Sequence, residues 1–387
     1  MRFSWGAIYA LFYLYRCVYS VLAQVVFLRL TSVPDTTGYQ TSNFGQFGQI
    51  SVLLESVETG LLMERNANLL TKLFASALSA VTGGSAILIN IGFQTFAFVG
   101  LLAFLMGLDT KTRIFVLLLV MTPTFSIWSS MASKEAIVVG LVGIVARYVV
   151  DIYNNRDSIK IYHLIVLGTL FMYKPQFFPA IIFVAGTSKL ARYFREPATV
   201  ALLAASASFV ALYFFRDVLD QFSQQIVWGI LQEPGQSQRV LSFSTRYDIF
   251  FQAPGGMFRA FLGPTVSEAA GNIFQLITLV ESLLILGALT GFVLMRLPRI
   301  PVYGAIIALF TVFWTMLANY PLGLANPGTA IRYRTDYILI IILAVAVLTS
   351  RNLYIDWRQN LLKIKSIKRR FSWGPPPSRM GPNDKSL

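Results

Sequence analysis

The sequence predicts an all-α, polytopic integral membrane protein. Hydrophobic residues make up 55% of the 387 residues and charged residues only 13%, whereas an ordinary soluble domain carries roughly 25% charged residues. Apolar runs recur along the chain, and several are long enough to cross a hydrocarbon core of about 30 Å. The basic residues gather in short segments between these runs, which is the pattern that encodes membrane topology.

Taken in order, the apolar runs predict about ten transmembrane helices. The fifth and sixth runs are shorter than about 17 residues and flank Tyr173-Lys174-Pro175-Gln176, so they are either two spans or a broken or re-entrant hairpin around a buried polar site. The first run is too long for a signal peptide and lacks a small-x-small cleavage site, so we expect it to remain as a helix. The runs are Ala7–Leu28, Ser85–Gly107, Ile114–Ser130, Ala136–Val150, Ile161–Tyr173, Phe178–Ser188, Thr199–Phe215, Ile273–Met295, Tyr303–Tyr320 and Tyr337–Leu348.

The distribution of lysine and arginine predicts cytoplasmic N- and C-termini. Residues 1–350 then form a transmembrane domain with two long extracytoplasmic loops, 29–84 and 216–272. Within the first loop, Ile50–Leu70 alternates apolar and charged residues as an interfacial helix would. Residues 351–387 form a basic, proline-containing cytoplasmic tail that we predict to be disordered.

Composition also excludes several kinds of site. The formal net charge of +14 is explained by topology, so we expect no nucleic-acid partner. The single cysteine, Cys17, excludes an intrachain disulfide and a cysteine-cluster metal site. The single histidine, His163, begins a span, and we interpret it as structural.

The candidate functional residues lie at the predicted outer ends of the spans. Asp35 follows the first span, after a proline and before Gly38-Tyr39, where its carboxylate can project into a cavity roofed by the other helices. Basic side chains at the same ends suit anionic oxygen atoms, because ammonium and guanidinium groups stabilise phosphate by charge-assisted hydrogen bonds. The alternative is that such cations only extend into the headgroup region. The basic candidates are Lys134, Lys174, Arg246, Arg259, Arg332 and Arg334, and the secondary acidic candidates are Glu135, Asp248 and Glu268.

Four short blocks resemble the GT-C glycosyltransferases and related bacterial polysaccharide polymerases. These blocks are Asp35 with Gly38-Tyr39, Trp128-Ser129-Ser130 with Lys134-Glu135, Arg259-Ala260-Phe261-Leu262-Gly263-Pro264 leading to Glu281, and Asn326 to Arg334. The resemblance implies a GT-C-like membrane enzyme that takes sugar from a polyprenyl-phosphate carrier. It implies that Asp35 is the general base for the acceptor hydroxyl, and that Lys174, Arg332 and Lys134 hold the phosphate leaving group.

The chain departs from this family at Thr36 and Thr37, where a tandem acidic pair is common. A divalent metal is therefore possible but not supported, no metal ligands are assigned, and the cofactor is unknown. The partners that the resemblance implies are a polyprenyl-phosphate-linked sugar or oligosaccharide, a glycan acceptor, the lipid bilayer and other polysaccharide-assembly proteins.

Two classes of function fit these features. The first is a glycosyltransferase on the periplasmic face of the bacterial cytoplasmic (inner) membrane, acting in exopolysaccharide, capsule or O-antigen synthesis, with a repeat-unit polymerase as its close alternative. In the polymerase, outer-loop arginines such as Arg239, Arg246 and Arg259 would dominate. The second class is a transporter or flippase of a lipid-linked or anionic substrate. The spans are nearly free of charge apart from Arg16, which favours chemistry on one face.

Overall fold

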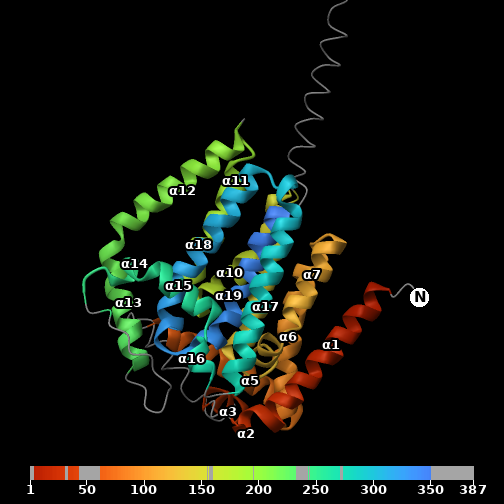
Figure 1. Cartoon of the computed structure of the whole chain (residues 1–387). Coiled ribbons are helices and arrows are strands. Elements are labelled where there is room, and N and C mark those ends of the chain that lie inside the picture. The colour runs from red at the N-terminus through yellow and green to blue at the C-terminus, as the bar shows by residue number, and fades with distance from the viewer. Residues whose placement is uncertain are drawn as a thin grey trace, which may run out of the picture. The chain divides into compact units, whose positions relative to one another are not determined.

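The computed structural model describes residues 4–30, 34–42, 62–154, 156, 160–194, 196–231, 243, 245–270 and 273–349. They belong to one compact unit, Met1–Ser350, and consist of helices and short connections (Figure 1). The all-α prediction is confirmed for this described part. The predicted tail, residues 351–387, is a separate unit and lies outside the described residues.

Among the residues that the structure describes, six helices are long and apolar enough to cross a membrane, or seven if one bent pair counts as a single span. The chain is therefore a multi-pass membrane protein, but the prediction of about ten spans is not confirmed. The bent pair consists of α10 (Ile161–Tyr173) and α11 (Phe178–Leu190). The six spans are α1 with its π-helical turn (Trp5–Phe27), α6 (Ala86–Met106), α9 (Lys134–Tyr153), α12 (Pro197–Phe214), α17 with the turn after it (Ile273–Arg299) and α18 (Val302–Ala325).

Two of the predicted spans differ from the helices that the structure shows. The run Ile114–Ser130 is divided between α7 (Thr110–Val120) and α8 (Pro123–Trp128), because Thr122 adopts an extended conformation and Pro123 starts a new helix. The last predicted span is part of a longer helix, α19 (Pro327–Thr349), whose first half carries Arg332, Arg334 and Asp336. Hydropathy alone did not indicate this splitting of one run or the charged extension of the other.

The break between α10 and α11 is sharp, since the two helix axes differ by 116°. Lys174 ends α10 with φ −146° and ψ 72°, and Pro175 opens a 3-10 turn, Pro175–Phe177. A residue before proline is disfavoured in the helical region, so the Lys174-Pro175 pair accounts for the break. Of the two alternatives that the sequence left open here, the bent pair is the one observed.

The described parts of the two long predicted loops are largely helical. The first contains α2 (Leu28–Leu30), α3 (Pro34–Gln40) and α5 (Leu62–Thr82). A helix was predicted over Ile50–Leu70, and α5 is helical from Leu62 to Thr82, while residues 50–61 lie outside the described residues. The second loop contains α13 (Arg216–Leu231), α14 (Asp248–Phe251), α15 (Ala253–Leu262) and α16 (Val266–Ala269).

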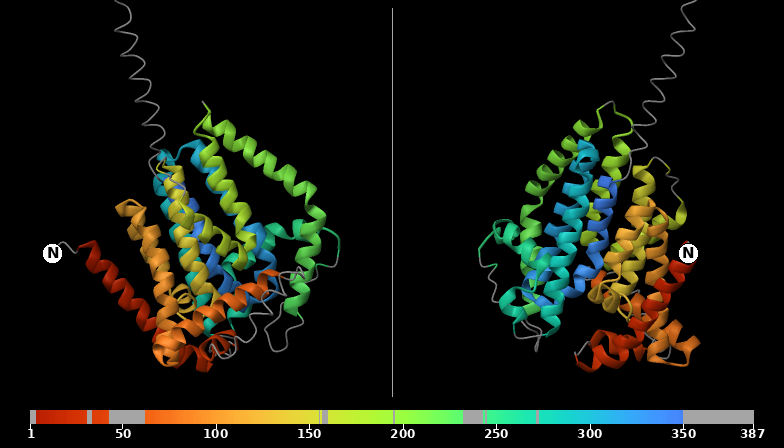
Figure 2. Two further views of the ribbon diagram at one scale, coloured as in Figure 1. Left: turned by 180° about the vertical axis from the view of Figure 1, so that it is seen from behind. Right: turned by 45° about the vertical axis from the view of Figure 1, so that its right-hand side comes forward.

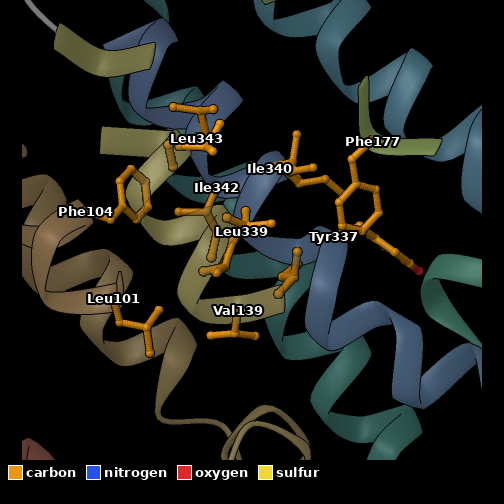
Figure 3. Close-up of a cluster of buried hydrophobic side chains, with 14 of the residues drawn as sticks. Leu101, Phe104, Val139, Phe177, Tyr337, Leu339, Ile340, Ile342 and Leu343 are labelled. Carbon is orange, nitrogen blue, oxygen red and sulfur yellow. The ribbon is translucent and has the colours of Figure 1, made fainter. Parts of the chain in front are cut away.

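The core lies where α6, α9 and α19 meet. Figure 3 shows Leu101 and Phe104 of α6 facing Val139 of α9 and Leu339 and Ile342 of α19, and all five side chains are buried. In contrast, α12 runs at an angle to α11 and α18 in both views of Figure 2, and most of its side chains are exposed. An apolar helix exposed in this way is suited to contact lipid.

Small residues bring α6 and α9 into backbone contact. A Cβ atom on Gly100 would collide with the carbonyl oxygen of Gly140, and one on Gly143 would collide with the carbonyl group of Gly100. Membrane helices associate closely through such small residues, because apolar burial drives their association little inside lipid. This contact therefore fixes the α6–α9 pair, and α9 carries Glu135 at its first turn.

We expect Gly100→Ala to lower the Tm of the detergent-solubilised protein, because forcing a methyl group into a filled contact costs about 1–3 kcal/mol. The matched control is Gly287→Ala in α17, where a Cβ atom meets no other atom within 4 Å. The control should retain the wild-type Tm or exceed it. An unchanged Tm for Gly100→Ala would contradict the close approach of the two helices.

Candidate functional site

Asp35 lies in the first turn of α3, directly after Pro34. Proline suits the first helical position and a carboxylate suits the positive end of a helix, so this short helix begins where the sequence favours it. The Asp35 side chain is 48% exposed, and its Oδ2 atom accepts a hydrogen bond of 3.1 Å from Arg332 Nη2. The sequence could not establish that these two residues meet, and the structure brings them into contact.

Arg332 also contacts a second carboxylate. Its Nε atom donates to Glu135 Oε1 at 2.7 Å, and the Glu135 side chain is fully buried at the start of α9. The guanidinium carbon lies 5.6 Å from the ring centre of Trp128 at the end of α8, within the range of a cation–π contact. Arg332 therefore links α3, α8, α9 and α19 at one point.

A second ion pair lies at the break between α10 and α11. Lys174 Nζ is 3.0 Å from Asp336 Oδ2 and 3.6 Å from the ring centre of Tyr333. Both charged side chains are almost completely buried. Lys174 was predicted as a site residue, but its partner Asp336 was not, although an acidic residue one helical turn after Arg332 inside an apolar helix was a usable signal.

Arg334 points to a different side of α19 and does not share these contacts. Its Nη2 atom donates to Thr124 Oγ1 at 3.0 Å and to Glu281 Oε1 at 3.3 Å, and its Nη1 atom donates to Ser282 Oγ. Glu281 Oε2 in turn accepts from the backbone N–H of Thr124 at 3.0 Å. This buried network joins α8, α17 and α19, and the sequence identified neither Glu281 nor Thr124 as a ligand of Arg334.

Three of the other predicted residues are bonded within their own segments or to a neighbouring one. Arg246 pairs with Asp217 of α13 at 2.7 Å, and both side chains are largely exposed. Asp248 accepts from the backbone N–H of Thr245 at 2.8 Å, next to its own helix start. Glu268 forms a capping box in which its Oε2 atom accepts from Thr265 N at 2.7 Å.

Lys134 lies at the N-terminal end of α9, and Arg259 lies near the C-terminal end of α15. Lys134 is the first residue of α9 and is partly buried, directly before Glu135. Arg259 lies in the last turn of α15 with an exposed side chain, where a cation suits the negative helix end. Arg239, which the polymerase hypothesis requires, lies outside the described residues.

The tyrosine that follows the predicted base is buried. Tyr39 donates a hydrogen bond of 2.7 Å to Asn68 Oδ1 of α5. Burial, followed by the negative charges of Asp35 and Glu135, raises the pKa of the Tyr39 hydroxyl well above its usual value. Tyr39 therefore remains protonated and acts as a donor that ties α3 to α5.

Arg332 contacts two carboxylates, those of Asp35 and Glu135, and Lys174 contacts the carboxylate of Asp336. A phosphate bound by Arg332 or Lys174 would therefore compete with carboxylates already in contact with them. The second oxygen of Glu135, Oε2, accepts no hydrogen bond from the described residues. Across the described part of the chain, no three His, Cys, Asp or Glu side chains are arranged to hold a metal ion.

Comparison with protein-family models, with curated proteins and with solved structures found no match to this chain.

The buried pair at the helix break leads to a stability prediction. Lys174→Met leaves the Asp336 carboxylate without its counter-charge, and removing one partner of a buried ion pair costs about 3–5 kcal/mol. We expect a large fall in Tm for Lys174→Met and a substantial recovery in Lys174→Met/Asp336→Leu, measured by thermal unfolding in detergent.

The matched control for this cycle is Arg147→Met, which breaks a partly exposed pair with Asp151 at 2.7 Å. A pair of that kind contributes about 0–1 kcal/mol, so this variant should melt close to the wild type. Additive losses in the double variant at Lys174 and Asp336 would show that the two side chains do not interact.

Proposed function

We propose that the protein is a membrane glycosyltransferase that transfers sugar from a polyprenyl-phosphate-linked donor to a glycan acceptor. The observation that carries the proposal is the half-exposed Asp35 carboxylate, oriented by Arg332 and backed by the buried Glu135. An accessible carboxylate beside a buried charged cluster is suited to accept a proton from an incoming hydroxyl group. The outer face of the bacterial cytoplasmic membrane, during surface polysaccharide synthesis, remains the setting that we propose.

In this mechanism Asp35 acts as the general base. Its carboxylate accepts the proton of the acceptor hydroxyl while the hydroxyl oxygen bonds to the anomeric carbon of the donor sugar. The bond from that carbon to the phosphate oxygen breaks, and the phosphate leaves with the bonding electron pair. Arg332 orients Asp35 through Nη2, and Glu135 holds the Arg332 guanidinium through Nε.

The phosphate would lie against the basic side chains that are near this cluster. Lys134 precedes Glu135 at the first turn of α9, and the guanidinium of Arg332 is partly exposed. Cations at these positions would offset the charge that develops on the leaving group. Lys174 is farther from solvent and is paired with Asp336, so its effect on the phosphate would be a long-range one.

We expect Asp35→Asn to reduce sugar transfer by at least about 10²-fold, because the amide cannot accept the proton. The measurement is the amount and chain length of surface polysaccharide from cells that carry the variant at matched membrane abundance. Arg332→Ala should give the same loss, with lipid-linked precursor accumulating in both. Asp151→Asn changes a surface ion pair of α9 and is the control that should retain wild-type product. Unchanged polysaccharide in the first two variants would exclude the proposed site.

The repeat-unit polymerase makes the opposite prediction for the outer-loop arginines. If the chain joins lipid-linked repeat units, Arg246→Ala and Arg259→Ala should shorten the polymer strongly and Asp35→Asn should leave considerable activity. For a transferase of single sugars we expect the reverse order, since Arg246 is an exposed residue already paired with Asp217. Chain-length analysis of the three variants in one strain distinguishes the two reactions.

One observation favours the transporter or flippase as a second candidate. A helix broken by 116°, with a buried lysine at the break, is a feature of transporter binding sites. Liposomes that contain the purified protein and a fluorescent lipid-linked sugar test this reading. A transporter would move the label between leaflets without an acceptor, whereas the transferase should leave the distribution unchanged and consume the donor only when the acceptor is present.

A further inference from the structure

A buried amide contacts two segments that carry the candidate site and is not part of the site. Asn90 of α6 is fully buried and makes four hydrogen bonds. Its Oδ1 atom accepts from Ala132 N at 2.8 Å and from Gln40 Nε2 at 3.0 Å. Its Nδ2 atom donates to Gln24 Oε1 at 3.3 Å and to Ser20 O at 3.4 Å.

The four bonds use the complete capacity of the side chain. A primary amide has two N–H donors and an oxygen with two acceptor sites, and Asn90 employs all of them. Aspartate would lose the donors and leucine would lose every bond, leaving buried partners unsatisfied. The position therefore requires an amide side chain of this length.

The partners of Asn90 come from the segments that carry the site. Gln40 is the last residue of α3, the short helix that holds Asp35. Ala132 lies in the connection between α8 and α9, between Trp128 and Glu135. The Asn90 side chain thus contacts both the helix that carries Asp35 and the connection that leads to Glu135.

The first helix, α1, also contributes a side chain to this network. Gln24 lies in the π-helical turn Ala23–Phe27, and its Oε1 atom also accepts from Gln40 Nε2 at 2.6 Å. A π-turn inserts an extra residue into a helix and changes the direction of the side chains within it, and such turns are frequent at functional sites. The π-turn therefore contains Gln24, the residue whose side chain joins α1 to α3 and α6.

The connection that Asn90 holds is also fixed at its other end. Arg16 of α1 is fully buried and donates from Nη2 to Ser129 O at 2.7 Å and to Ser129 Oγ at 3.0 Å. Ser129 is the C-cap of α8, so the arginine satisfies a carbonyl group at a buried helix end. With both ends held by side chains from other helices, the α8–α9 connection has a defined position relative to α3.

We propose that Asn90 is a positioning residue that sets the distance between α3, with its base Asp35, and the α8–α9 connection that leads to Glu135. Its expected effect on turnover rests on the proposed glycosyl transfer, whereas its effect on the geometry of α3 does not. A residue that only supports the fold would change the stability of the protein and leave the position of α3 unaltered in the molecules that remain folded.

The chain offers a closely matched control one turn further along α6. Gln94 is also a fully buried amide, and it donates to Tyr13 O of α1 at 3.4 Å. Its oxygen has no hydrogen-bond partner in the described part of the chain. Gln94→Leu therefore removes a buried amide from the same helix without releasing α3 or the α8–α9 connection.

The first experiment measures the position of α3 directly. Spin labels are attached to Thr37→Cys on α3 and Phe258→Cys on α15, both exposed positions, in a Cys17→Ser background that has no other cysteine. Pulsed dipolar spectroscopy in lipid nanodiscs should give a narrow distance distribution for the parent protein and for Gln94→Leu. Asn90→Leu and Gln40→Leu should broaden or shift it. A narrow, unshifted distribution in folded Asn90→Leu would overturn the proposal, and Gln40→Leu decides the question if Asn90→Leu does not fold.

The second experiment measures turnover of a polyprenyl-phosphate-linked sugar by the purified protein. We expect Asn90→Leu to lower kcat by about 10²-fold, the effect of a misplacement of about 1 Å, with the donor KM near its wild-type value. Gln94→Leu should retain both constants, and equal kcat values for the two variants would overturn the catalytic part of the inference. A wild-type protein without transfer would reject the proposed function alone, because the distance measurement tests the position of α3 independently.

Discussion

The rest of the site depends on the guanidinium of Arg332, which lies between two carboxylates supplied by distant parts of the chain. Charges in a membrane protein are stable only when they are paired, hydrogen-bonded or exposed to water. The neighbouring residues of α19 follow the same rule, because Arg334 pairs with Glu281 and Asp336 pairs with Lys174. Charged side chains on different sides of α19 therefore contact α3, α8, α9, α17 and the α10–α11 break, and the neutralisation of buried charge contributes to the positions of these elements.

Irregular backbone occurs where the polar side chains gather. The α7–α8 interruption, the break at Lys174-Pro175 and the π-helical turn in α1 each lie beside a hydrogen bond or ion pair of the site or of the Asn90 network. Departures from regular helix are tolerated at membrane depth only where other protein groups satisfy the released backbone atoms. Beside the α7–α8 interruption Glu281 accepts from the backbone N–H of Thr124, and just before the π-helical turn Asn90 donates to the carbonyl oxygen of Ser20. Asp35 remains half exposed at the edge of this arrangement, where the general base that we propose would be accessible to an acceptor.

The sequence predicted the helical membrane class and indicated Asp35 and Arg332 as candidate site residues, because composition and charge at span ends are local properties. It did not predict their contact, since they are 297 residues apart and only the tertiary fold brings them together. The prediction of about ten spans is not confirmed, because hydropathy does not detect the helix restart at Thr122-Pro123 and does not decide between two spans and a bent pair at Lys174-Pro175. Asp336 and Glu281 were missed as partners for a related reason, since the role of each carboxylate depends on the cation that faces it in the tertiary fold. The sequence did not indicate Asn90, because one polar residue within an apolar span forms no periodic pattern.

We propose that Asp35 and Arg332 act as one unit in sugar transfer. The most direct test is a double-mutant cycle on the turnover of a polyprenyl-phosphate-linked sugar by the purified protein, with Asp35→Asn, Arg332→Ala and the double variant. Residues that act as a unit are strongly non-additive, so the double variant should be no slower than the slower single variant. Losses that multiply in the double variant would contradict the claim, because they would mean that the two side chains contribute to the reaction independently.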